Sequence, residues 1–318
     1  MKAQSPPLLI VGTGAMASLF AARLLAAGFP VLMLGSWQAG LQALRSHGVR
    51  LVDLEGRETS CPVRVYEDPV ECLGARYALV LVKSWQTSRA AHQLAHCLGP
   101  QGLALTLQNG LGNREILTET LGEERVALGV TTLGANLIEP GRVRLAGDGS
   151  IQLGDHPRLD PLAEMLRVAG FHVETIPDTR ALVWGKLAIN AAINPLTALL
   201  QVPNGELLQR PTARALMGSA AAEVEAVAAA RGVRLPYSDT PSAAEEVARR
   251  TSANYSSMLC DIQRGAPTEI DAICGAIVRA GEQAQVPTPV NRTLWHLVKA
   301  LADGSSNGRG NGGATDRS

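Results

Sequence analysis

The first half of the chain contains short, uninterrupted apolar runs separated by stretches with helical periodicity. These runs occupy residues 8–11, 31–34, 78–82, 103–107 and 126–130. None of them alternates with polar positions as a half-exposed strand does, so we expect parallel strands covered on both faces. The helical stretch 15–27 lies between the first two runs and ends at Gly28, a typical C-terminal glycine. The pattern predicts an α/β fold in this half.

The remaining segments divide into a mixed part before residue 178 and a helical part after it. In the mixed part, residues 49–65 are predicted to form a small hairpin, strands are expected at 142–145 and 151–153, and a helix is expected near 160–169. Beyond residue 178 every periodic segment is helical: 180–201, 211–231, 239–253, 269–285 and 291–301. We therefore predict an α/β domain over residues 1–177 and an all-α domain over 178–303. Residues 304–318, rich in Gly, Ser and Asn, are predicted to form a disordered tail.

Composition agrees with two folded domains and excludes several classes of protein. The chain has 318 residues, of which 46% are hydrophobic and only 3% aromatic, so the cores must consist of Ala, Leu and Val. Basic and acidic residues are equal at 29 each, which argues against a protein that mainly binds nucleic acid. The five cysteines show no CxxC spacing, which argues against disulfides and zinc and favours the reducing cytoplasm. We also expect no signal peptide, no membrane span and no metal.

A glycine-rich turn follows the first predicted strand. Its sequence is Gly12-Thr13-Gly14-Ala15-Met16-Ala17. Gly12 permits a tight turn, Gly14 lets the backbone approach a pyrophosphate, and Ala17 still allows close packing of helix on strand. The free N–H groups and the positive dipole end of the following helix would face the phosphates. Between a strand and a helix this motif indicates a Rossmann-like dinucleotide-binding domain, with a simple tight turn as the alternative.

The end of the second predicted strand bears on the choice of dinucleotide. Proteins that bind NAD usually have an acidic residue about 20 residues after the glycine motif, where it holds the ribose 2′-hydroxyl. Here the strand ends Leu34-Gly35-Ser36-Trp37, without a carboxylate that would repel a 2′-phosphate. Ser36 can donate one hydrogen bond to that phosphate, and the nearest arginine is Arg45. The sequence therefore favours NADP(H).

A polar stripe interrupts an otherwise apolar predicted helix. Lys186, Asn190 and Asn194 lie at i, i+4 and i+8, hence on one face, and Pro195 should kink the helix beside them. Burial lowers the pKa of a lysine toward the working pH, which suits donation of a proton to a carbonyl oxygen as hydride arrives on the carbon. The two amides would hold a hydroxyl or carboxylate. The alternative is a structural polar network between helices.

Two further polar stretches follow, at Ser256–Asp261 and Thr268–Asp271. Ser257 is predicted to lie at a helix start, and Thr268-Glu269 to open another helix. Helix starts bind anions such as carboxylates, and Glu269 would hold Lys186 or a substrate hydroxyl. Ordinary N-capping is the alternative.

Taken together, these motifs resemble the ketopantoate reductase (2-dehydropantoate 2-reductase) family over almost the whole chain. The matching stretches are the glycine turn, Val82–Gln86, Gln108–Gly110, Lys186–Thr197, Pro203–Leu207, Asn254–Asp261, Thr268–Asp271 and Val286–Asn291. The resemblance implies an NADP-binding Rossmann domain and a helical domain like the C-terminal domain of 6-phosphogluconate dehydrogenase, with the substrate in the cleft between them. It also implies reduction of 2-dehydropantoate to (R)-pantoate, a step of pantothenate and coenzyme A biosynthesis, by a monomer or homodimer.

The resemblance implies roles for individual residues as well. Lys186 falls on the position of the proton donor, and Glu269 is the second catalytic candidate. The implied substrate-binding residues are Asn109, Lys186, Asn190, Asn194, Asn204 and Ser257. The implied cofactor-binding residues are Gly12, Thr13, Gly14, Ala15, Met16, Ala17, Ser36, Lys83, Asn109, Ala135 and Glu269.

Three positions depart from the family pattern. Ala17 replaces the third glycine, Ser36 stands where the family often has arginine, and Cys260 replaces a common glutamine. Two other functions stay open from the sequence. One is a related dehydrogenase with another substrate, such as a 3-hydroxy acid, because those enzymes share the domain plan and a lysine with asparagine four residues on. The other is a dinucleotide sensor without catalytic activity.

Overall fold

The computed structural model describes residues 7–307 and divides into two units by internal contacts. The first unit contains the described residues up to Gln108 together with Gly112–Thr179. The second contains Asn109–Leu111 together with the described residues from Arg180 onward. The contacts thus place the boundary between the units between residues 179 and 180, whereas the sequence suggested a boundary between residues 177 and 178. They also assign residues 109–111, which lie in the first half of the chain, to the second unit.

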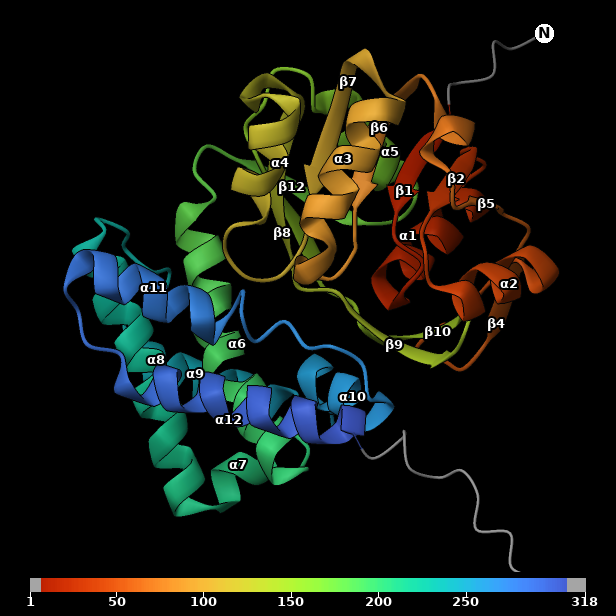
Figure 1. The fold of residues 1–318 in the computed structure, drawn as a ribbon. Helices are drawn as coiled ribbons and strands as arrows, with labels where there is room; N and C mark the ends of the chain where they lie inside the picture. The colour runs from red at the N-terminus through yellow and green to blue at the C-terminus, as the bar shows by residue number, and fades with distance from the viewer. Residues whose placement is uncertain (1–6, 308–318) are drawn as a thin grey trace, which may run out of the picture. The chain divides into compact units, whose positions relative to one another are not determined.

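An eight-stranded sheet forms the centre of the first unit (Figure 1). Its order is β12-β11-β8-β7-β6-β1-β2-β5, and β8 with β11 is the one antiparallel pair of neighbours in it. The strands are β1 Leu8–Val11, β2 Val31–Leu34, β5 Arg64–Tyr66, β6 Ala75–Val80, β7 Leu98–Thr106, β8 Val126–Thr131, β11 Ser150–Gly154 and β12 His172–Ile176. The predicted α/β class with parallel strands is confirmed.

Helices and a second sheet cover this large sheet. The helices α3 Thr87–Cys97 and α4 Asn113–Leu121 lie over one face (Figure 1), where they share an apolar core with β1, β6 and β7. On the other face a second core joins β1 to α1 Ala15–Ala26, to α5 Asp160–Val168 and to the smaller sheet.

The smaller sheet has the order β4-β3-β10-β9. Its strands are β3 Val49–Val52, β4 Glu58–Cys61, β9 Gly134–Glu139 and β10 Arg142–Gly147. The predicted hairpin within 49–65 is present as the antiparallel pair β3 and β4, whereas β5 joins the large sheet. The remaining elements of this unit are α2 Gln38–His47 and the 3-10 turns η1 Pro69–Cys72, η2 Ser84–Gln86 and η3 Glu123–Arg125.

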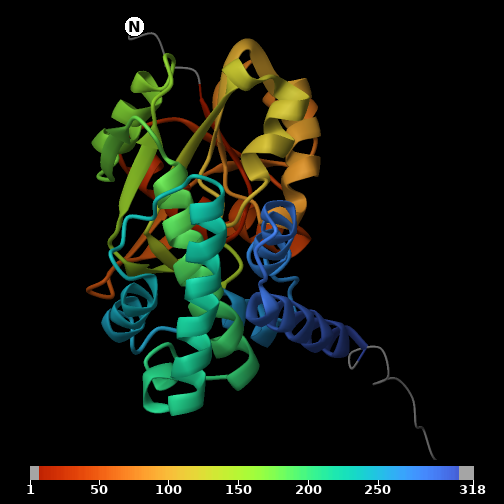
Figure 2. The same ribbon diagram turned by 90° about the vertical axis from the view of Figure 1, so that its left-hand side faces the viewer.

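The described part of the second unit contains helices and no strand, as predicted. Its helices are α6 Arg180–Leu200, α7 Glu206–Gln209, α8 Pro211–Ala230, α9 Thr240–Arg250, α10 Ser257–Arg264, α11 Cys274–Ala284 and α12 Pro289–Asn307. The long helices α6 and α8 run side by side (Figure 2). Their shared core consists almost entirely of Ala, Leu, Ile and Val, as the low aromatic content required.

Two predicted boundaries in this unit are wrong. The helix expected over 269–285 begins at Cys274, and residues 269–273 form turns instead. The reason is local, because Ile273 has φ −99° and ψ −95°, which are not helical angles. The tail expected from Gly304 also begins too early, since α12 continues to Asn307. Residues 308–318 lie outside the described part of the chain.

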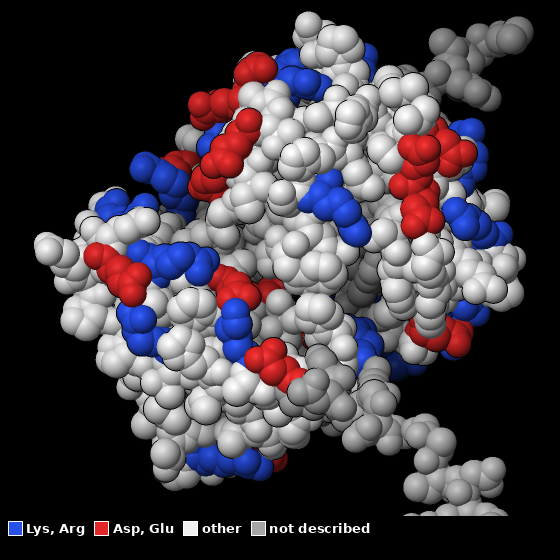
Figure 3. Space-filling model, viewed as in Figure 1, with Lys and Arg blue, Asp and Glu red and all other residues white. Residues whose placement is uncertain are grey.

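Four further features of the described residues concern membranes, cysteines, metals and surface charge. In the described chain no helix combines the length and apolarity that crossing a bilayer requires. All five cysteines are free, and the described residues contain no group of three or more His, Cys, Asp or Glu arranged to hold a metal. On the face shown in Figure 3, acidic and basic side chains are interspersed. This mixing agrees with the equal numbers of acidic and basic residues in the sequence.

We expect the packing of α1 to depend strongly on Phe20. This side chain is fully buried and stacks on Phe171 with ring centroids 4.5 Å apart. Phe20→Ala should lower the free energy of unfolding by about 3–5 kcal/mol, because it leaves a cavity in the core. Urea-induced unfolding measures this loss. Leu54→Ala is the control, since Leu54 is 57% exposed and its truncation should change stability by no more than about 0.5 kcal/mol.

Candidate functional site

The glycine turn connects β1 to α1 in a conformation that only glycine adopts easily. Gly12 has φ +134°, and a Cβ atom there would lie 3.1 Å from the Leu81 carbonyl oxygen and 3.3 Å from the Ala17 Cβ. Ala17 is itself fully buried. The turn therefore packs tightly against the chain that follows β6, with alanine small enough at the third position of the motif.

The start of α1 borders open space, unlike the closely packed Gly12. Gly14 is the N-cap residue, and a Cβ there would meet no atom within 4 Å. No side chain caps the helix, and its first turn contains no acidic residue. N–H groups at an uncapped helix start, beside open space, attract anions. The residues present therefore fit the pyrophosphate of a dinucleotide.

Ser36 follows β2 close to this turn. The preceding Gly35 packs so closely on Thr13 that a Cβ would lie 2.7 Å from its Cγ2 atom. Ser36 is partly buried, whereas Arg45, in the last turn of α2, is exposed. The structure thus places Ser36 beside the glycine turn, at the carboxyl end of a parallel strand where dinucleotide ribose is bound in such folds.

Two further cofactor candidates of the first unit lie in different elements. Lys83 is partly buried and immediately precedes η2, just beyond the carboxyl end of β6, the strand next to β1. Ala135 lies in β9 of the smaller sheet and is also partly buried. The carboxyl ends of β1, β2 and β6 thus present the glycine turn, Ser36 and Lys83 at one edge of the sheet.

The predicted polar stripe lies on α6 in the second unit. Lys186 and Asn190 are half-buried, and Asn194 is only 8% exposed. Burial of the ammonium group lowers the pKa of Lys186 to about 8, while the negative charge of Glu269 raises it. In a fraction of the protein molecules Lys186 is therefore neutral near physiological pH. The structure places Glu269 close enough to interact electrostatically with this lysine.

Residues 236–237 pack closely on α6 at Gly185, which precedes Lys186 in the chain. A Cβ on the neighbouring Gly185 would lie 2.8 Å from Pro236 Cδ and 3.3 Å from a ring carbon of Tyr237. Glycine at this position lets residues 236–237 approach the backbone of α6. Pro195 lies within the same helix, which continues without interruption to Leu200.

Glu269 is 5% exposed and lies in the turn before α11. Its Oε2 atom accepts a hydrogen bond from Asn109 Nδ2 at 3.2 Å. Next along the chain, the Leu111 N–H donates to the Ala272 carbonyl at 3.0 Å. Three candidate residues, Lys186, Asn109 and Glu269, are thus brought together in the second unit. The assignment of residues 109–111 to this unit had no signal in the sequence.

The two adjacent serines at the start of α10 have different roles. Ser256 is the N-cap, and its Oγ accepts a hydrogen bond from the Leu259 N–H at 3.1 Å. The same oxygen lies 2.7 Å from Thr197 Oγ1, which links α10 to α6. Ser257 is the first helical residue and is exposed. The cap is therefore provided by Ser256, which the sequence interpretation did not single out, and the Ser257 hydroxyl is not needed for it.

Asn204 is held by the loop that follows α9. Its backbone N–H donates to the Asn254 carbonyl at 3.0 Å, and its Nδ2 donates to Thr251 Oγ1 at 2.9 Å. The side chain is almost fully buried, and its Oδ1 atom has no hydrogen-bond partner among the described residues. This amide is fixed in position by both contacts.

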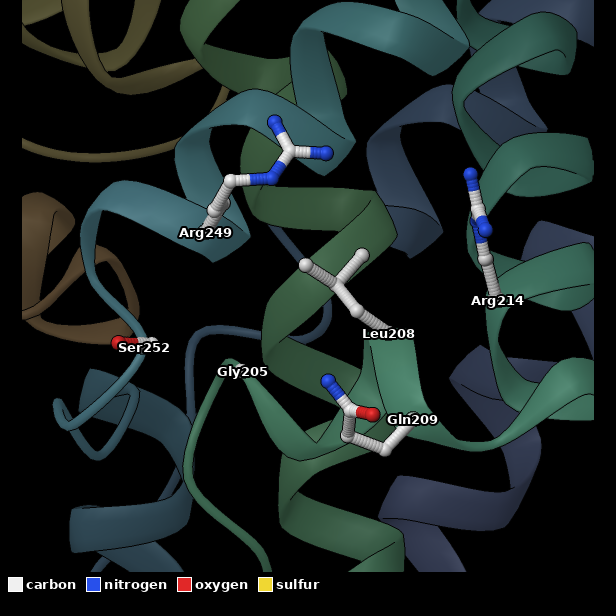
Figure 4. A pocket seen from close by; sticks show the side chains of 6 residues that line it. All are labelled: Gly205, Leu208, Gln209, Arg214, Arg249 and Ser252. Atoms are coloured by element: carbon white, nitrogen blue, oxygen red, sulfur yellow. The ribbon is translucent and has the colours of Figure 1, made fainter.

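A separate cavity of about 410 Å³ is lined by Gly205, the residue that follows Asn204, and by five other residues of the second unit (Figure 4). Its lining residues are Gly205, Leu208, Gln209, Arg214, Arg249 and Ser252. Arg214 pairs with Glu245 at 2.6 Å, and Arg249 pairs with Glu246. Both arginines thus have carboxylate partners, and none of the predicted site residues lines this cavity.

Comparison with known families gives matches over both units. The model of "Ketopantoate reductase PanE/ApbA" matches residues 8–158, and that of "Ketopantoate reductase PanE/ApbA C terminal" matches residues 178–302. A 2-dehydropantoate 2-reductase of Archaeoglobus fulgidus is 37% identical over 302 residues, which cover 93% of this chain and 97% of that protein.

Solved structures agree in fold over nearly the whole length. A PanE/ApbA family ketopantoate reductase from Ralstonia eutropha JMP134 is 33% identical with a TM-score of 0.88, over 94% of this chain and 99% of that one. A D-mandelate dehydrogenase in a ternary structure with NADH and anilino(oxo)acetate is 27% identical with a TM-score of 0.88, over the same shares.

Burial of the Lys186 ammonium group should reduce the stability of the fold. Its pKa falls from 10.5 to about 8, so the unfolded chain binds the proton more tightly than the native protein. We expect Lys186→Met to raise the free energy of unfolding by about 3 kcal/mol at pH 7. The gain should be constant below pH 8 and shrink as the pH rises toward 10.5. Urea unfolding at a series of pH values measures it, and a difference between variant and wild type that did not change between pH 8 and 10.5 would contradict the burial of a charged group.

Proposed function

Because the chain belongs to the ketopantoate reductase family, we propose that it reduces 2-dehydropantoate to (R)-pantoate with NADPH. The observation that supports this most directly is the half-buried Lys186, with its lowered pKa, beside the buried Glu269. The small-molecule substrate is part of the proposal, and so is a cytoplasmic location, which the five free cysteines favour.

The dinucleotide would be held mainly by the first unit. When bound, it supplies the hydride that reduces the ketone carbon. The backbone of Gly12-Thr13-Gly14 and the N–H groups at the start of α1 would bind its pyrophosphate. Ser36 would donate to the 2′-phosphate of NADPH, where a carboxylate would repel it. By family resemblance, Ala15, Met16, Ala17, Lys83, Asn109 and Ala135 complete the cofactor contacts.

Lys186 would donate the proton from its Nζ atom to the oxygen of the ketone. Burial weakens the hold of the amine on this proton and favours its transfer as negative charge develops on the oxygen. The negative charge of Glu269 raises the pKa of Lys186 and so favours its protonated form near neutral pH. Burial and Glu269 together would therefore keep the pKa of the proton donor close to the pH at which the enzyme works.

Amide and hydroxyl groups of the second unit would orient the substrate. Asn190 and Asn194 lie one and two turns beyond Lys186 on α6, and Asn204 is fixed by its loop contacts. The exposed Ser257 at the start of α10 adds a hydroxyl. Such groups suit the carboxylate and hydroxyl of a 2-oxo acid, and orientation of this kind brings the ketone to the donor.

Similarity to D-mandelate dehydrogenase supports a second candidate function, the reduction of a different 2-oxo acid. That protein was solved with NADH and an anilino(oxo)acetate ligand, and its structure resembles this one as closely as a ketopantoate reductase does by TM-score. Cys260, in place of a common family glutamine, is a point where substrate fit would differ. Both the acid and the dinucleotide therefore need direct measurement.

The proposal predicts the substrate and the cofactor of the wild-type enzyme. Oxidation of NADPH and of NADH should be followed at 340 nm with 2-dehydropantoate, phenylglyoxylate and other 2-oxo acids. We expect the highest kcat/KM for 2-dehydropantoate with NADPH. A higher value for an aromatic 2-oxo acid with NADH would instead support the second candidate.

Lys186→Ala should remove the proton donor without affecting the dinucleotide site of the first unit. Turnover of 2-dehydropantoate should fall by about 10²- to 10⁴-fold, the usual contribution of general acid catalysis. Fluorescence titration should show unchanged NADPH affinity. Turnover close to that of the wild type would rule out Lys186 as the donor.

Glu269→Gln should change the pH dependence of turnover. Because the carboxylate raises the pKa of Lys186, its removal lowers that pKa further below about 8. Reduction requires the protonated lysine, so kcat of the wild type should fall as the pH rises through about 8. In the variant this fall should occur at lower pH. A pH profile of kcat measures the change, and an unchanged profile would show that Glu269 does not act on the donor.

A further inference from the structure

Residues 109–111 are attached to the turn 269–272 by three contacts. The Asn109 amide donates to the Glu269 carboxylate at 3.2 Å, and the Leu111 N–H donates to the Ala272 carbonyl at 3.0 Å. Between them, Gly110 packs directly on Ala272. All three residues of this short segment thus contact the turn: Asn109 through its side chain, Gly110 by close packing and Leu111 through its backbone N–H.

Gly110 meets both conditions that require glycine. It has φ +84°, and a Cβ there would lie 2.5 Å from the Ala272 carbonyl oxygen and 2.7 Å from the Ala272 Cβ. Real Cβ atoms essentially never approach backbone atoms so closely, so an added methyl group must displace one partner. Gly112, two residues later, has a similar φ of +92°, but its Cβ would meet nothing within 4 Å.

The turn is held from its other side as well. The Asp271 carboxylate accepts hydrogen bonds from Trp295 Nε1 at 2.7 Å and from Lys299 Nζ at 3.1 Å. Its backbone carbonyl accepts from Arg279 at 2.8 Å. These contacts connect the turn to α11 and α12. An added methyl group at residue 110 would therefore push the segment 109–111 away rather than move the turn.

We propose that Gly110 is a positioning residue for catalysis: its fit against Ala272 holds the Asn109 amide on the Glu269 carboxylate and so fixes the partner of the proton donor Lys186. This inference rests on the proposed function, because it assigns Gly110 a role in the same reaction. Gly110 itself touches neither substrate nor the reacting atoms and acts through Asn109.

The test compares two alanine substitutions with similar backbone strain. Gly110→Ala should lower kcat for 2-dehydropantoate by about 10- to 100-fold, the effect expected when a catalytic group is misplaced by about 1 Å. Gly112→Ala should leave kcat within about twofold, since it adds the same strain without the contact. Equal losses in both variants would overturn the inference.

A double-mutant cycle distinguishes positioning from a general structural effect. If Gly110 acts through Asn109, then Gly110→Ala should cause no further loss of kcat in an Asn109→Ala background. Additive losses would overturn the inference. Wild-type turnover tests the proposed function separately.

Amide hydrogen exchange at Leu111 requires no substrate. It should become faster in Gly110→Ala and stay unchanged in Gly112→Ala. Unchanged exchange in Gly110→Ala would overturn the inference even if the enzyme proves to act on another acid.

Discussion

The proposed chemistry depends on the desolvation of the Lys186 ammonium group, which lies on a helix whose neighbouring positions are apolar. Thirteen residues of α6 are buried, and Gly185 lets residues 236–237 pack against the helix beside the lysine. Desolvation lowers the pKa to about 8, and the Glu269 carboxylate limits that fall. A free lysine would hold its proton too tightly to be an efficient acid near neutral pH. The packing that disfavours the charge is therefore what suits the group to proton transfer.

Glu269 can limit the pKa shift only if its own position is fixed. The residue lies in the turn before α11, where its carbonyl accepts hydrogen bonds from the N–H groups of Ala272 and Ile273 at 3.0 and 3.1 Å. Two further sets of contacts hold the turn itself. On one side Asp271 connects the turn to α11 and α12, and on the other the segment 109–111 packs against Ala272. This segment follows β7 in the chain but belongs to the second unit by its contacts, so the chain connects the two units at more than one point.

Much of the fold follows from local sequence. Uninterrupted apolar runs located β1 and β2 to the residue, and the i, i+4, i+8 spacing located the polar face of α6. Other features depend on tertiary contacts that no local pattern contains. The attachment of residues 109–111 to the turn at 269–272 joins positions 160 residues apart. Ser256, and not Ser257, caps α10 because its hydroxyl also meets Thr197 on α6. The same local signal, two adjacent serines, was compatible with either.

The role of Lys186 as an acid depends on its ionisation near neutral pH, and the chain is well suited to measuring that ionisation. The sequence contains only four lysines, Lys2, Lys83, Lys186 and Lys299. NMR of protein labelled with ¹³C at lysine Cε would follow each ammonium group through a pH titration, with Lys186→Met identifying the Lys186 signal. The structure predicts that this signal titrates near pH 8. A pKa at the ordinary value of 10.5 would show that the group is solvated, and it would contradict the proposal that burial lowers the pKa of Lys186 and makes it an efficient proton donor.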